Sequence, residues 1–197
     1  YKPIGDEMIT GFQLFLEQND QRLGGHPVDL LLADEGESPE SGQAALNALL
    51  ERDVTALTGV VNSADLLGIG DAVVAARVPL VGSNASPASL QSVVYIWRTS
   101  YVDDEPARAL APYVAQRVPA GGRVAIIAPD YQSGLDAVEG FRQAFGASDS
   151  RIADEVIWTE FTTSPSEDAY ASAVDRMIGR NPDAVFCHFA GAAAIVF

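Results

Sequence analysis

The chain has 197 residues, of which 48% are hydrophobic and 8% aromatic, so it can form one large globular domain or two small ones. Its 12 basic and 27 acidic residues give a net charge of −15 at pH 7, which argues against a nucleic-acid partner. No apolar run approaches the roughly 18 residues of a membrane-spanning helix. The single cysteine, Cys187, excludes an internal disulfide.

The first third of the chain reads as helix, turn, strand and helix. An apolar set predicts a helix over residues 6–19, and the Gly-Gly and Pro content of residues 23–27 predicts a turn. Residues 28–33 form a short apolar run typical of a buried strand. Ser38 and Pro39 then signal the start of a helix that runs to about residue 51.

Residues 55–87 form the most informative stretch. A Val- and Leu-rich strand over residues 55–61 precedes a helix over 65–76 and a second strand over 78–81, so the two strands should be parallel. Ligands of such sheets bind outside the carboxyl ends of the strands. The residues at these two ends are small and polar, and we interpret them as ligand-binding candidates: Asn62, Ser63, Ser83, Asn84 and Ala85.

The alternation of strand and helix continues to the end of the chain. The expected strands cover residues 93–98, 123–127, 153–161 and 184–188, and the expected helices cover 104–117, 135–145, 168–179 and 191–197. This order predicts an α/β protein with parallel sheets. The polar residues 99–104 suggest a break between an N-terminal lobe, 1–99, and part of a C-terminal lobe, 100–197.

Two Rossmann-like lobes joined by a hinge would leave a cleft lined by strand-end loops of both lobes. Residues 62–63 and 83–85 would then face residues 130–134 and 189–192, which adds Tyr131 and Ser133 to the ligand-binding candidates. No strand precedes the first helix, and the last helix stops without a cap. We therefore expect a fragment that lacks the first strand and the C-terminal part of a longer protein.

Several short motifs occur in the order and spacing of a known family. They are Gly5-Asp6, the stretch from Leu23-Gly24-Gly25 to Asp34, Gly59 with Asn62-Ser63, Pro79-Leu80-Val81 with Ala85-Ser86-Pro87, Trp97-Arg98-Thr99, and Arg123 to Ile127 with Tyr131 and Ser133-Gly134. Together they resemble the type I periplasmic solute-binding proteins of ABC transporters, in the branch that binds leucine, isoleucine and valine.

This resemblance implies a bilobed clamp that closes on a small organic solute and delivers it to an ABC permease. It implies a periplasmic protein or a lipoprotein of the cell envelope, without cofactor, metal or catalysis. In relatives the position of Ser63 binds a ligand carboxylate through its hydroxyl, and the positions of Ser83 and Ala85 add main-chain or hydroxyl contacts. A plain helix cap is the alternative role for Ser63.

The chain also departs from the family pattern. Ser133 stands where relatives have a tyrosine, and Tyr131 lies two residues earlier; Ala192 stands where amino-acid binders often have an aromatic residue. These departures argue against specificity for amino acids, so the expected solutes include, besides an amino acid, an aromatic acid, an amide or another small organic molecule. Two other classes stay open: the ligand-sensing domain of a transcription regulator or receptor with the same fold, and an enzyme on a Rossmann-like sheet, against which the missing nucleophile–base pair argues.

Overall fold

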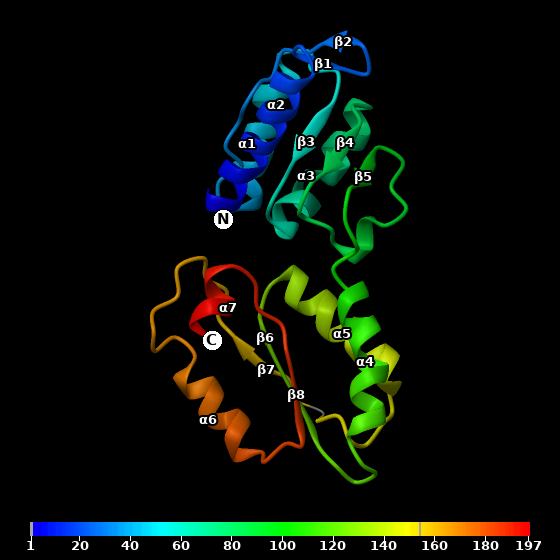
Figure 1. Ribbon diagram of the computed structural model, residues 1–197, viewed down its shortest axis with the longest axis vertical. Helices are drawn as coiled ribbons and strands as arrows, with labels where there is room; N and C mark the ends of the chain where they lie inside the picture. The colour runs from blue at the N-terminus through cyan, green and yellow to red at the C-terminus, as the bar shows by residue number, and fades with distance from the viewer. Residues whose placement is uncertain (1, 154) are drawn as a thin grey trace. The chain divides into compact units, whose positions relative to one another are not determined.

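The computed structural model describes residues 2–153 and 155–197 of the chain (Figure 1). The chain divides into two compact units, Tyr1–Ser100 and Tyr101–Phe197. Each unit contains one parallel three-stranded sheet. The predicted α/β class with parallel sheets is confirmed.

The first unit begins with a helix and builds its sheet from the second half of its residues. Its elements are α1 (Lys2–Gln18), β1 (Arg22–Leu23), β2 (His26–Pro27), α2 (Pro39–Leu50), β3 (Leu57–Gly59), α3 (Ser63–Ala76), β4 (Leu80–Gly82), the 3₁₀ helix η1 (Ala88–Leu90) and β5 (Ile96–Arg98). Strands β3, β4 and β5 are neighbours in this order and run parallel. The β3–α3–β4 unit is therefore the expected strand–helix–strand stretch.

The core of the first unit lies between its helices and this sheet. Leu46 of α2, Leu66 and Val73 of α3, Leu80 and Ile96 are among its buried side chains. Helices α2 and α3 approach closely at Gly42, where an added Cβ atom would lie only 3.3 Å from the Cβ atom of Asp65.

The buried strand predicted for residues 28–33 is wrong. These residues are assigned to no strand, and Leu32 is 57% exposed. The helix before them is also poorly covered, since Leu16 is the one buried residue of α1 in the described part of the chain. An apolar run becomes a strand only where a neighbouring strand satisfies its backbone groups, and none of the described strands pairs with this run.

The second unit alternates helices and strands throughout. Its elements are α4 (Glu105–Arg117), β6 (Val124–Pro129), α5 (Gln132–Gly146), β7 (Ile157–Thr159), α6 (Ala171–Gly179), β8 (Ala184–Cys187) and α7 (Ala192–Val196). All three strands are parallel in the order β7–β6–β8, so β6 is central, and all six of its residues are buried.

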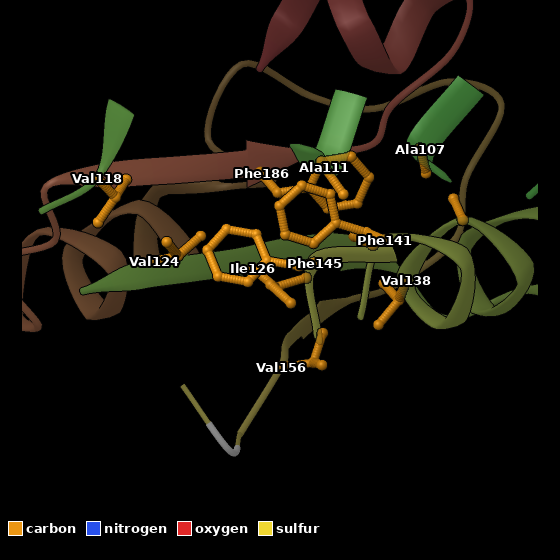
Figure 2. Close-up of a cluster of buried hydrophobic side chains, with 12 residues drawn as sticks. Ala107, Ala111, Val118, Val124, Ile126, Val138, Phe141, Phe145, Val156 and Phe186 are labelled. Atoms are coloured by element: carbon orange, nitrogen blue, oxygen red, sulfur yellow. The ribbon is translucent and has the colours of Figure 1, made fainter. Parts of the chain in front are cut away.

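Helices cover both faces of the second sheet. On one face α4 and α5 pack over a cluster in which the rings of Phe141 and Phe186 stack at 4.2 Å (Figure 2). On the other face Ile127 and Ile157 pack against Ala173 of α6. Figure 1 shows α6 on the side of this sheet opposite α4 and α5. Two covered faces explain why these strands are continuous apolar runs in the sequence.

Candidate functional site

Two loops meet at the carboxyl ends of β3 and β4. The loop after β3 leads into α3, and the loop after β4 carries three of the predicted site residues. Three hydrogen bonds join the loops: Ser83 N to Gly59 O at 2.8 Å, Ala85 N to Val60 O at 3.0 Å, and Asn84 Nδ2 to Val61 O at 2.8 Å. The structure therefore brings together the five candidates of the first unit.

The first turn of α3 settles which residue caps this helix. Asn62 is the N-cap, and its side-chain oxygen accepts a hydrogen bond from Ala64 N at 2.9 Å. Ser63 is the first residue of the helix and is 5% exposed. The alternative interpretation of Ser63 as the N-cap is therefore wrong, and the cap role belongs to the residue before it.

Two other candidates, Ala85 and Ser83, make contacts that stabilise the loops after β3 and β4. The side chain of Ala85 is 2% exposed and belongs to the core, while its N–H is the group that binds Val60. The Ser83 hydroxyl lies 3.2 Å from the Thr58 hydroxyl of the neighbouring strand. Val60 itself has a φ of 61°, which is strained for a β-branched residue.

Sequence reasoning missed Glu35, which lies at the same place. Its Oε1 atom accepts backbone hydrogen bonds from Val61 N at 2.9 Å and Asn62 N at 3.2 Å. Burial raises the pKa of this carboxyl group, and the two hydrogen bonds oppose that rise. The only signal in the sequence was a pair of acidic residues, Asp34 and Glu35, that follows the apolar run at residues 28–33.

The second unit has its own loop cluster at the carboxyl ends of its strands. Ser133 lies in the first turn of α5, after β6, and its Oγ atom is 3.2 Å from Nε2 of His188, which directly follows β8. Tyr131 is the N-cap residue of α5, and its ring stacks on Phe161 at 4.2 Å with an interplanar angle of 21°. The segments after all three strands thus carry these two contacts, a polar one between the ends of β6 and β8 and an aromatic one between the ends of β6 and β7.

The position of this cluster follows from the strand order. Strand β6 lies between β7 and β8, the chain leaves β6 through α5 on one face of the sheet, and the α6 crossover lies on the other face. Phe197, which follows α7, also packs on the α6 face, so the segments after β6 and β8 leave on opposite faces. Such a switch point between adjacent parallel strands is where open α/β sheets bind ligands.

His188 is the second residue that sequence reasoning missed as a site residue. Burial lowers the pKa of His188 below its usual range, so its imidazole is neutral at pH 7. The described residues contain no group of three His, Cys, Asp or Glu side chains arranged to hold a metal ion. Among the same residues no helix is long and apolar enough to cross a bilayer.

Comparison with known proteins gives a match over the whole chain. Residues 1–197 match the family described as "Periplasmic binding protein". The chain belongs to the periplasmic binding protein family. A comparison with curated proteins gives no match.

Solved structures of solute-binding proteins are similar to this chain. One is the solute-binding protein of an ABC transporter from Rhodopseudomonas palustris in complex with 3,4-dihydroxybenzoic acid, with a TM-score of 0.81, 21% identity, and coverage of 95% of this chain and 50% of that one. An ABC transporter substrate-binding protein from Sphaerobacter thermophilus has a TM-score of 0.70 and 27% identity over 93% and 50% of the two chains. A leucine-binding protein from Thermotoga maritima has a TM-score of 0.71 and 21% identity over 90% and 49%.

These similarities establish the fold, and they also show how much of each solved protein this chain covers. The chain spans about half the length of each of the three solved proteins, whose covered shares are 50%, 50% and 49%. The recognised resemblance to solute-binding proteins of ABC transporters is thereby confirmed at the level of family and fold.

Proposed function

We propose that the chain is part of a solute-binding protein that captures a small organic molecule and delivers it to the permease of an ABC transporter. The match of all 197 residues to the periplasmic binding protein family carries this proposal. The protein binds its solute without catalysis. It is located outside the cytoplasm, in the periplasm or on a lipid anchor of the cell envelope.

The solute contacts would come from the loops at the carboxyl ends of the two sheets. In the first unit we assign contacts to Ser63, Ser83 and the backbone of Ala85. Asn62 and Asn84 hold these loops through their side-chain hydrogen bonds and so position the contacts. In the second unit we assign contacts to Tyr131 and Ser133.

The solute class that this set favours is an aromatic acid. The stacked rings of Tyr131 and Phe161 offer a flat apolar surface, and Ser133, two residues after Tyr131, offers a hydroxyl. Among the similar structures one holds 3,4-dihydroxybenzoic acid and others hold 4-hydroxybenzoate, whereas another is a leucine-binding protein. Amino acids and amides are therefore the competing solute classes.

A thermal-shift screen on the full-length protein tests the proposal. The panel contains benzoate, 4-hydroxybenzoate, 3,4-dihydroxybenzoate, benzamide and L-leucine. A bound solute at 100 times its dissociation constant should raise the free energy of unfolding by about 2.7 kcal/mol. Stabilisation by the aromatic acids supports the assignment, stabilisation by leucine alone moves it to amino acids, and no stabilisation by any of the five contradicts solute capture of these classes.

A further inference from the structure

The pair formed by Ser133 and His188 has a location that helix capping and core packing do not explain. The two residues lie 55 positions apart in the sequence, and their side chains meet because β6 and β8 are neighbours in the sheet. The N-cap position of α5 belongs to Tyr131, so the Ser133 hydroxyl is not needed there. The pair stands at the switch point of the second sheet, and both residues are only partly buried.

We propose that His188 is a specificity-determining residue which, together with Ser133, binds a hydroxyl or carbonyl group on the solute. This inference rests on the proposed function and names a contact residue that the family resemblance did not supply. The backbone fixes its place, since His188 N donates to Ile127 O at 3.1 Å and so extends the pairing of β8 with β6.

The chemistry of the pair follows from its neutral state. A neutral imidazole has one N–H and one bare nitrogen, and the tautomer determines which of them faces Ser133. When the bare nitrogen accepts the Ser133 proton, the serine oxygen is left to accept a hydrogen bond from a solute. When the imidazole donates, the serine O–H is left to donate. Because both tautomers are neutral, the pair can match a solute group that donates, accepts or does both.

A charged ammonium group suits this location less well. An ammonium needs several acceptors or an acidic side chain, and the pair supplies one serine oxygen. Tyr131, whose ring stacks on Phe161, lies two residues before Ser133, so an aromatic side chain enters the same loop as the pair. A solute ring that carries a hydroxyl or an amide can therefore pack on the aromatic side chains and hydrogen-bond to the pair. 4-Hydroxybenzoate can make this hydrogen bond, and benzoate cannot.

The test measures dissociation constants of benzoate and 4-hydroxybenzoate by titration calorimetry on the full-length protein and on its variants Ser133→Ala, His188→Phe and His188→Gln. In wild type we expect 4-hydroxybenzoate to bind roughly 2- to 10-fold more tightly than benzoate, the range of one neutral hydrogen bond. Ser133→Ala and His188→Phe should each abolish this preference. His188→Gln should restore part of it, because its amide keeps a hydrogen-bonding group near the position of Nε2.

His26→Ala is the matched control, because His26 is the other histidine of the sequence and lies exposed in β2. It should leave both dissociation constants unchanged. Imidazole NMR signals give a second readout that a purely structural role would not move: 4-hydroxybenzoate should shift the His188 signal and not that of His26.

The outcomes separate the two proposals. If wild type binds a solute of the panel and the three variants of the pair keep its affinity and the wild-type preference, the inference about His188 is overturned while solute capture stands. If wild type binds none of the panel, the inference about His188 and solute capture of these classes are both overturned. Equal loss of benzoate and 4-hydroxybenzoate affinity in His188→Phe, without rescue by His188→Gln, also overturns the inference, because it assigns His188 a structural role.

Discussion

Glu35 accepts a hydrogen bond from the backbone N–H of Val61 at 2.9 Å, so a carboxylate lies at the carboxyl end of β3. The same oxygen also binds Asn62 N, one residue before Ser63. A solute carboxylate that approached Ser63 would meet this negative charge. The charge of Glu35 should therefore weaken the binding of an anionic solute at Ser63, an effect that the uncharged loop residues Asn62 and Ser63 did not reveal.

Glu35→Gln tests this repulsion between Glu35 and a solute carboxylate, because glutamine keeps an acceptor oxygen for the two backbone groups and removes the charge. We expect benzoate to bind the variant about 5- to 30-fold more tightly at pH 7, since like charges within several ångströms repel by roughly 1–2 kcal/mol near a protein surface. Titration calorimetry at low and high salt measures the effect, which salt should weaken. Glu37→Gln serves as a nearby control, and tighter binding of that variant to the same degree would assign the effect to general charge.

Asp65 gives a prediction about stability and pH. Its side chain is fully buried in α3 and accepts no hydrogen bond from the part of the chain that the structure describes. Burial, with smaller contributions from Glu35, Glu37 and Glu40, raises the pKa of Asp65 to about 6. A raised carboxyl pKa means that the folded state binds the proton more tightly than the unfolded state, so this group lowers the free energy of unfolding as pH rises from about 4 to about 6.

Asp65→Asn should therefore stabilise the protein at pH 7 by about 1–3 kcal/mol and have little effect near pH 3, below both pKa values, where the carboxyl group is mostly neutral in both states. Urea unfolding at the two pH values measures this difference. The control is Asp71→Asn, at an exposed position of the same helix. A stabilisation that is the same at both pH values would show that side-chain shape and not ionisation is responsible.

The neighbouring residues Asn62 and Ser63 should have separable roles. Asn62→Ala removes the cap of α3 and should lower the free energy of unfolding by about 1 kcal/mol. Ser63→Ala should instead weaken binding of a carboxylate solute by roughly 1.5–3 kcal/mol, the value of a hydrogen bond to a charged group. Thermal unfolding without solute and calorimetry with benzoate distinguish the two effects. Unchanged benzoate affinity in Ser63→Ala would remove Ser63 from the site.

The sequence predicted the strands and helices well because parallel strands covered on both faces are continuous apolar runs. It failed at residues 28–33, since an apolar run does not show whether a neighbouring strand is present to pair with it. It also could not pair Ser133 with His188. That contact depends on the order β7–β6–β8, which places the third strand of the unit next to the first.

The same limit applies to Glu35. Its acceptor oxygen reaches backbone groups 26 and 27 residues later in the chain, and side-chain to backbone contacts of this range leave no periodic signal. The small polar residues after β3 and β4 were predictable because strand-end loops of a strand–helix–strand unit have a fixed place in the sheet. What each residue does there depends on its contacts in the folded chain: Asn62 caps a helix, while Ala85 packs in the core.

Gly134 follows Ser133 and determines how closely α5 approaches β6. A Cβ atom added at Gly134 would collide with the carbonyl oxygen of Pro129, the last residue of β6. Gly134→Ala must therefore push the first turn of α5 away from the strand, at a cost of about 1–3 kcal/mol in the free energy of unfolding. Because this turn carries Ser133, the shift should also separate its hydroxyl from His188 and reduce the preference for 4-hydroxybenzoate over benzoate.

The matched control for Gly134→Ala is Gly179→Ala, at the last residue of α6, where an added Cβ atom meets no atom within 4 Å. This control should be neutral or slightly stabilising, because alanine favours a helix over glycine by up to about 1 kcal/mol. Thermal unfolding and calorimetry on both variants give the comparison. If Gly134→Ala lowers stability but keeps the wild-type preference for 4-hydroxybenzoate, the position of Ser133 does not control solute recognition, and the close approach of α5 to β6 serves packing alone.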